Sequence, residues 1–273
     1  AATHSVQAAI GGVDVEQRLE QELKRDYHII TAEPRLAQVA RDFVTHYTTA
    51  WESGKALFVC IDKITCVRLY NLIARYWAER YAELDIALAE AADAQEEAVL
   101  RRQLAWMAET RMAVVISEEQ GEVAKFRDRG LDITPHRRLL KEGLELPATM
   151  RQQPQFRTMQ RMAVDDAFKE AAHPFRIAIV CAMWLTGFDV PSLGTLYLDK
   201  PLKAHTLMQA IARANRVAEG KNNGLIVDYC GILKHLRSAL TTFAGAADSG
   251  HLDGGEVEPA RPAEELLTDL GES

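Results

Sequence analysis

The sequence lacks the features that mark membrane, secreted and metal-binding proteins. Among its 273 residues the longest apolar runs, such as residues 177–185, fall far short of the roughly 20 residues that a membrane-spanning helix needs. No basic segment followed by an apolar segment, as in a secretory signal, opens the chain. Its 4 cysteines form no CxxC pair, and no His or Cys neighbour has zinc-ligand spacing. We therefore expect a cytoplasmic protein with reduced cysteines, no membrane contact and no metal site of its own.

The sequence also lacks the Gly-rich loop that cradles nucleotide phosphates. The pattern G-x-x-x-x-G-K-[ST] is absent, because Gly54 and Lys55 are followed by Ala56 and the preceding glycine is missing. There is no acidic box for magnesium, and no cluster of acids with a lysine of the kind that nucleases use. On its own, the chain is therefore not expected to hydrolyse a nucleotide.

The net charge of −7 is unevenly distributed along the chain. Residues 151–240 contain 12 Lys and Arg against 7 Asp and Glu, whereas residues 241–273 contain 1 Arg against 8 acids. The local positive balance of residues 151–240 permits contact with nucleic acid without requiring it.

Five apolar runs of strand length alternate with helical patterns. The runs cover residues 56–61, 112–117, 176–182, 194–199 and 224–229. The helical patterns cover about residues 33–50, 62–82, 93–109, 160–171, 203–217 and 231–243. Buried strands that alternate with helices predict an α/β fold, a parallel sheet flanked by helices, whose ligands bind beyond the carboxyl ends of the strands. The residues at or just after such ends are Asp62, Ser117, Gly187, Asp199 and Asp228.

These patterns predict three parts in the chain. Residues 1–32 read as a lead-in from a preceding domain, residues 33–244 as the α/β domain, and the acidic residues 245–273 as a linker or tail. Within the domain, residues 83–110 predict a helical excursion packed on the domain edge. Residues 118–159 have no strong period and predict a long connection, which in a compact domain is usually functional or mobile.

One apolar strand ends in residues suited to a nucleotide. Thr186, Gly187 and Asp189 follow the run that ends at residue 182. The glycine permits a turn or a close approach of the backbone, and the carboxylate can accept a hydrogen bond from a ribose hydroxyl. A purely conformational role is the alternative for the glycine.

A second segment places an amide and two guanidiniums together. Gln209, Arg213 and Arg216 are spaced by four and three residues, so a helix would present all three on one face. Such a set suits a polyphosphate whose charge grows during phosphoryl transfer. Ordinary surface salt bridges are the alternative for the two arginines.

These two segments resemble motifs of a known family. Thr186-Gly187-Phe188-Asp189 with Pro191 resembles motif V, and the Gln209 segment resembles motif VI, of superfamily 2 helicases and translocases. The longer stretch WLTGFDVPSLGTLYLDKPLKAHTLMQAIARANRV, followed by GKNNGLIVDYCGI, resembles the second motor domain of the R subunit of type I restriction enzymes. GKALFVCIDKITCVRLYNLI resembles the motif IV region of that family. The resemblance covers about residues 27–240, least in residues 83–160, and implies a RecA-like sheet of the P-loop NTPase fold.

The resemblance implies roles for the nucleotide-facing residues. Gln209 and Arg213 would approach the γ-phosphate of ATP, and Arg216 would act as the arginine finger that stabilises charge in the transition state. Asp189 would contact the ribose, and Gly187 would allow close approach of the backbone.

The resemblance also implies contacts with nucleic acid. Lys63, Thr65, Ser117 and Thr186 lie at strand ends that match the nucleic-acid face, which implies contacts with backbone phosphates. For Lys63 a solvated side chain is the alternative.

For the whole protein the resemblance implies an ATP-dependent DNA translocase and endonuclease subunit. A first motor domain and a nuclease domain of the same chain would be its partners, with modification and specificity subunits, duplex DNA, and ATP and Mg²⁺ held mainly by the first motor domain. Two alternatives stay open: a motor of another superfamily 2 enzyme of repair or remodelling, and a catalytically inert RecA-like interaction module.

Overall fold

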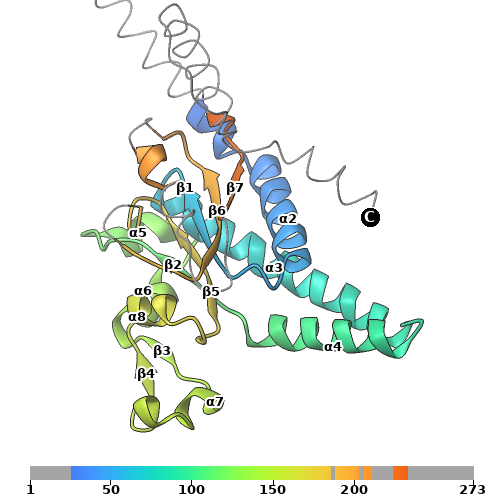
Figure 1. The fold of residues 1–273 in the computed structure, drawn as a ribbon. Coiled ribbons are helices and arrows are strands. Elements are labelled where there is room, and N and C mark those ends of the chain that lie inside the picture. Colours follow the sequence, from blue (N-terminus) through green and yellow to red (C-terminus); the bar gives the residue numbers. More distant parts are fainter. Residues whose placement is uncertain (1–25, 186–187, 203–205, 211–223, 233–273) are drawn as a thin grey trace, which may run out of the picture. The chain divides into compact units, whose positions relative to one another are not determined.

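Five parallel strands form one sheet in the order β2–β5–β1–β6–β7 (Figure 1). The computed structural model describes residues 26–185, 188–202, 206–210 and 224–232. The strands are β1 Lys55–Cys60, β2 Arg111–Val115, β5 Phe175–Val180, β6 Leu193–Asp199 and β7 Leu225–Asp228. Each lies within two residues of its predicted bounds, and the predicted α/β fold with a RecA-like parallel sheet is confirmed.

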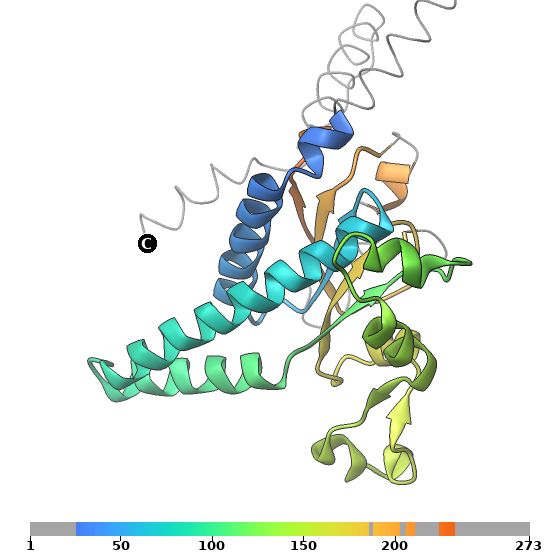
Figure 2. The ribbon, with the colours of Figure 1, turned by 180° about the vertical axis from the view of Figure 1, so that it is seen from behind.

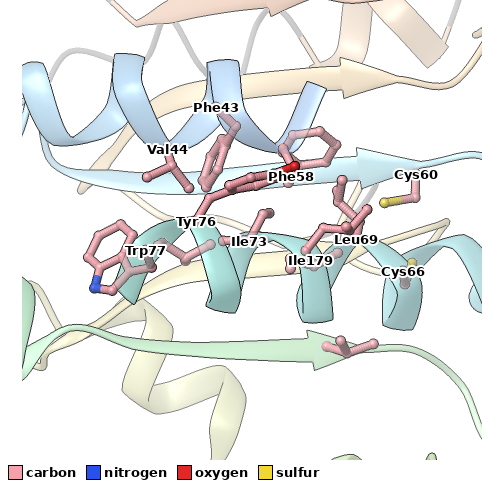
Figure 3. Close-up of a cluster of buried hydrophobic side chains, with 14 of the residues drawn as sticks. Phe43, Val44, Phe58, Cys60, Cys66, Leu69, Ile73, Tyr76, Trp77 and Ile179 are labelled. Atoms are coloured by element: carbon pink, nitrogen blue, oxygen red, sulfur yellow. The ribbon is translucent and has the colours of Figure 1, made fainter. Parts of the chain in front are cut away.

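Helices cover both faces of this sheet, as a parallel sheet requires. Alternate residues of β1 point to opposite faces. Phe58 packs with α2 Glu33–Thr49 and α3 Lys63–Ala89 (Figure 3). Leu57 lies on the other face, where it lines a small cavity with residues of α8 Val164–Lys169 and of the helix at residues 206–210.

Aromatic side chains form the centre of the larger core cluster. The Phe43 ring is fully buried and meets the rings of Phe58 and Tyr197 edge-on, with centroids 5.3 and 4.6 Å away. Tyr47 is also fully buried, and its hydroxyl donates to the Gly54 carbonyl over 2.8 Å. Each ring contributes about 1.5–3 kcal/mol through burial, so this cluster fixes α2 on the sheet.

The predicted helical excursion is a helical hairpin. The helix predicted over residues 62–82 continues to Ala89, and α4 Ala94–Glu109 packs against it (Figures 1 and 2). Asp93 begins α4 by accepting from the backbone amides of two residues in its first turn. The predicted excursion therefore combines the end of one helix with a second helix.

The long connection between β2 and β5 is structured. It contains α5 Glu122–Arg127, α6 Thr134–Glu142, β3 Leu144–Glu145, α7 Ala148–Arg151, the short helix η1 Pro154–Phe156 and β4 Arg161–Met162, followed by α8. Strands β3 and β4 pair antiparallel. The helix predicted over residues 160–171 is wrong at its start, because residues 161 and 162 pair with β3 and α8 begins only at Val164.

Some predictions fall outside the described residues. These are most of the lead-in 1–32, the predicted tail 245–273, most of the predicted helix 203–217 and nearly all of the predicted helix 231–243. The proposed domain bounds therefore stay predictions. Within the described ranges, no helix is long and apolar enough to cross a bilayer, and the cysteines are free thiols, three of them buried.

Candidate functional site

The junction of β1 and α3 places a carboxylate and a lysine at the carboxyl edge of the sheet. Asp62 caps α3 by accepting from the Thr65 amide over 2.6 Å. It also accepts from the Tyr27 hydroxyl over 2.5 Å, and this bond raises the pKa of Tyr27 to about 12. Lys63, the next residue, forms an ion pair with Glu119 at 3.3 Å, and its side chain is 25% exposed.

Glu119 holds two lysines at this edge. It accepts from Lys125 as well as from Lys63, each over 3.3 Å, and these hydrogen bonds lower the pKa of its exposed carboxyl. Two ammonium groups therefore share one carboxylate beside Ser117, which is exposed at the end of β2.

The end of β2 is held by a nearly buried ion pair. Arg137 of α6 donates to the carbonyls of Ile116 and Ser117 over 2.6 and 2.9 Å. The same guanidinium pairs with Glu122, whose side chain is 6% exposed. Burying both charges is tolerable because each finds partners, so this pair fixes the position of Ser117.

A second buried pair ties α2 to the ends of β6 and β7. Asp199 is fully buried and accepts from Arg35 over 2.6 Å. Arg35 also donates to the carbonyls of Ile30 and Tyr229 over 2.9 and 3.0 Å. Burial lowers the pKa of Arg35, but the bond and charge of Asp199 more than offset it and leave that pKa raised. The hydrogen bonds of this pair therefore hold elements of the protein together.

The segments that resemble motifs V and VI meet in one small apolar cavity of about 10 Å³, room for roughly one water molecule. Trp184 and Phe188 stack on each other with centroids 4.2 Å apart, and Trp184 also stacks on Phe168 of α8. Ala210, next to Gln209, lines the same cavity. Trp184 has φ of 67°, a left-handed conformation that a bulky residue adopts only when its surroundings impose it.

Asp189 and Gln209 are both exposed close to this cavity. In the helix at residues 206–210, Leu207 and Ala210 are buried, and this directs Gln209 toward the exposed side. The structure therefore brings the two segments together, with a carboxylate on one and an amide on the other.

Of the remaining predicted site residues, one is buried and four lie outside the described ranges. Thr65 is 1% exposed, and its hydroxyl has no hydrogen-bond partner in the described part of the chain, so direct contact with nucleic acid would require the helix start to move. Thr186, Gly187, Arg213 and Arg216 lie outside the described residues, and their roles stay predictions.

Two structural cations at this edge were missed from the sequence. Arg35 contacts Asp199, 164 residues away, and Arg137 contacts Ile116, 21 residues away, and the sequence pattern pointed only to the acids at strand ends. Within the described ranges, no group of three His, Cys, Asp or Glu side chains that could hold a metal ion occurs.

Comparison with known proteins identifies the family. Residues 52–231 match the family model described as type I restriction enzyme subunit R domain 3. The chain is 29% identical over 248 residues to the type I restriction enzyme HindI endonuclease subunit of Haemophilus influenzae, an alignment that covers 88% of this chain and 19% of that protein. It is 32% identical over 221 residues to the putative type I restriction enzyme MjaIXP endonuclease subunit of Methanocaldococcus jannaschii, covering 80% and 16%. A 74-residue stretch is 47% identical to the SauCOLORF180P endonuclease subunit of Staphylococcus aureus, covering 27% and 8%.

The chain spans no more than about a fifth of the length of these relatives. The family model nevertheless covers well over half of the chain and includes every strand of the parallel sheet. This chain belongs to the R subunit family of type I restriction enzymes.

Proposed function

We propose that this chain supplies the arginine-finger half of an ATP site, and part of a duplex DNA track, in an ATP-dependent type I restriction endonuclease subunit. Family membership supports the restriction role, since the relatives are named endonuclease subunits. The observation that carries the nucleotide role is the shared cavity that joins the segments of Asp189 and Gln209, each exposed beside it.

The chemistry of this donor set fits a nucleotide shared with another domain. In the proposal Asp189 accepts from the ribose, and Gln209 and Arg213 donate to the γ-phosphate. Arg216 stabilises the charge that develops on the transferred phosphoryl group, and Gly187 lets the backbone approach closely. Bound ATP supplies the phosphoryl group whose transfer to water drives movement, and a first motor domain would hold Mg²⁺ and most of the phosphate contacts.

The nucleic-acid side of the proposal rests on Lys63, Ser117 and the predicted contacts of Thr65 and Thr186. Lys63 pairs with Glu119 at the surface, and such exposed pairs contribute only about 0–1 kcal/mol. A DNA phosphate can therefore replace Glu119 as the partner of Lys63 at little cost. Closing and opening of the two motor domains around ATP would move these contacts along the duplex.

The partners in this proposal are the first motor domain and the nuclease domain of the same longer chain, with modification and specificity subunits, in the cytoplasm. The specificity subunit would select the DNA sequence, because contacts with phosphates carry no sequence information. The nuclease activity would then belong to another domain.

The test is Arg216→Ala in the full-length R subunit, assembled with its modification and specificity subunits. Loss of an arginine finger lowers turnover by about 10³–10⁵-fold, so DNA-stimulated ATP hydrolysis should fall into that range. The control is Arg101→Ala on the exposed face of α4, where the arginine pairs with Glu97. Unaltered turnover of the Arg216 variant would remove the finger assignment and favour an inert RecA-like module.

A second measurement concerns the isolated chain. The 273-residue chain lacks the phosphate-binding loop, so it should show no ATP hydrolysis with or without duplex DNA. Measurable DNA-stimulated turnover would contradict the proposal that a second domain completes the site.

A further inference from the structure

The tip of the β3–β4 hairpin, residues 146–160, has an unusual amino-acid composition, and none of its residues belongs to the nucleotide or DNA sites proposed above. No Asp or Glu occurs from Leu146 to Val164, although the chain contains 39 acids in 273 residues. The same stretch holds three arginines, four glutamines and two threonines, which are Arg151, Arg157, Arg161, Gln152, Gln153, Gln155, Gln160, Thr149 and Thr158. All of these side chains can donate hydrogen bonds, and none carries negative charge.

This tip is an ordered unit rather than an extended loop. The Leu146 amide donates to the Gln160 carbonyl over 3.0 Å, and the amides of Arg151 and Gln153 close the turn of α7. The side chains of Leu146 and Met150 are buried. The exposed polar side chains of the tip are therefore held on a fixed backbone.

Two of the three arginines are available to a partner. Arg161 uses its guanidinium for Glu142 at 2.8 Å and Glu145 at 3.0 Å. Arg151 and Arg157 are exposed, and within the described part of the chain their side chains form no hydrogen bond or ion pair. Glu142 also pairs with Arg138, so Arg138 and Arg161 together offset the two acids of the hairpin base. In the described part of the chain no acid pairs with Arg151 or Arg157, which leaves the positive charge of the tip uncompensated.

The β3–β4 hairpin extends from the end of the sheet opposite the carboxyl ends of the strands (Figures 1 and 2). Lys63 and Ser117 follow the carboxyl ends of β1 and β2. Its second strand leads through α8 to the amino end of β5, and the end of α8 contacts Lys55 at the amino end of β1. The tip and the carboxyl ends of the strands are therefore two separate contact surfaces, and a bound molecule would reach each of them with a different segment.

We propose that the tip binds the sugar–phosphate backbone of duplex DNA. Arginine, glutamine and threonine side chains are among the usual donors to phosphate oxygens, and a surface without acids avoids repulsion of the phosphates. The inference rests on the proposed function, which makes duplex DNA the substrate, and it adds a contact outside the motifs of the motor. An acidic protein surface is the competing occupant, and the experiment separates the two.

The experiment measures binding of a short duplex to the 273-residue chain by fluorescence anisotropy between 50 and 200 mM salt. Each phosphate contact contributes about 0.9 to the slope of log K against log salt, so Arg151→Gln with Arg157→Gln should reduce that slope by about 1.8. The loss of affinity between these two salt concentrations then becomes about 12-fold smaller than in the unchanged chain. Arg151→Lys with Arg157→Lys keeps both charges and should keep the slope.

The matched control is Arg75→Gln with Arg101→Gln. These exposed arginines pair with Glu79 and Glu97 on α3 and α4, so the control makes the same change in net charge elsewhere. If the tip variant and the unchanged chain have equal slopes, the inference is overturned in favour of a protein partner. If the control reduces the slope as much as the tip variant does, the inference is overturned in favour of a general charge effect. Absence of duplex binding by the unchanged chain at 50 mM salt overturns it as well.

A second measurement shows contact directly. A photocrosslinker attached at Thr158→Cys, an exposed position of the tip, should crosslink to the duplex, whereas one at Ala98→Cys on α4 should not. No crosslink from position 158 counts against the inference. Such a failure would leave ATP turnover dependent on Arg216, so it is distinguishable from failure of the proposed function.

Discussion

Lys55 is a buried cation whose charge should make the stability of this domain depend on pH. It opens β1, is 2% exposed, and donates from its ammonium to the carbonyls of Ala167 and Glu170 over 3.0 and 2.7 Å. These carbonyls end α8, where positive charge is favoured. Burial nevertheless lowers the pKa of Lys55 to about 7, partly offset by the charge of Glu170.

The direction in which Lys55 changes the free energy of unfolding with pH follows from the protons bound by the folded and unfolded states. The unfolded chain keeps the lysine pKa near 10.4, so between about pH 7 and pH 10 the unfolded state binds more protons than the folded state. The contribution of Lys55 to stability is therefore complete only above the unfolded pKa and is lost as the pH falls toward 7. Between pH 9 and pH 7 the loss is about 2 kcal/mol, an upper limit because the two carbonyl bonds favour the ammonium.

Lys55→Met should remove this dependence, since methionine fills similar volume without a charge. Urea unfolding at pH 7, 8 and 9 gives the free energy of unfolding for both chains, and the variant should gain about 2 kcal/mol relative to the unchanged chain as the pH falls from 9 to 7. Lys141→Met, at an exposed lysine, is the control and should show no such change. A difference between the Lys55 variant and the unchanged chain that stays constant from pH 7 to 9 would refute the reasoning.

Two further predictions concern single contacts. Arg35→Met leaves the fully buried Asp199 carboxylate without its ion pair and should lower the free energy of unfolding by about 3–5 kcal/mol, while adding Asp199→Asn should restore part of it. A double variant no more stable than the Arg35 variant would show that the pair is not the cause. Gly143→Ala should destabilise the β3–β4 hairpin, because a Cβ there would collide with the Met162 carbonyl and φ is 76°. Gly121→Ala has a similar φ of 74° and open space, so in urea unfolding it should show only the smaller backbone cost of about 1 kcal/mol, and an equal loss in both would argue against the collision.

The central strands β1, β5 and β6 were predictable because each is a largely apolar run that is buried almost throughout. The edge strand β7 is partly exposed and was predictable from its apolar residues alone. In β1 and β6 every residue is buried and most are apolar, with Lys55, Thr195 and Asp199 as the buried polar residues. Residues 160–171 contain no comparable run of apolar residues. The first of them belong to β4, where exposed Arg161 and buried Met162 pair with β3, and a two-residue strand is too short to show a period.

The position of the candidate site was predictable, but its contacts were not. Parallel strands end at one edge, and Asp62, Ser117 and Asp199 do lie at or just after strand ends, as the sequence predicted. The sequence could not show that Asp199 is held by Arg35, because 164 residues separate them. For Thr65 the apolar period of α3 already contained a warning, since it shares the buried side of the helix with Leu69 and Leu72.

Most cations described at the carboxyl edge are already committed to the protein itself. Arg35 and Arg137 each donate to a carboxylate and to strand-end carbonyls, and Lys200 donates to the Cys181 carbonyl over 2.7 Å. These bonds fix the strand ends, but they leave little positive charge there for a nucleotide. In the proposed ATP site, neutralisation of the γ-phosphate by this chain is assigned to Arg213 and Arg216, since Lys63 is assigned to DNA. We therefore expect Arg216→Ala to lower ATP turnover by about 10³–10⁵-fold while the fold is retained, because the apolar core and the bonds of Arg35 and Arg137 at the strand ends do not involve Arg216.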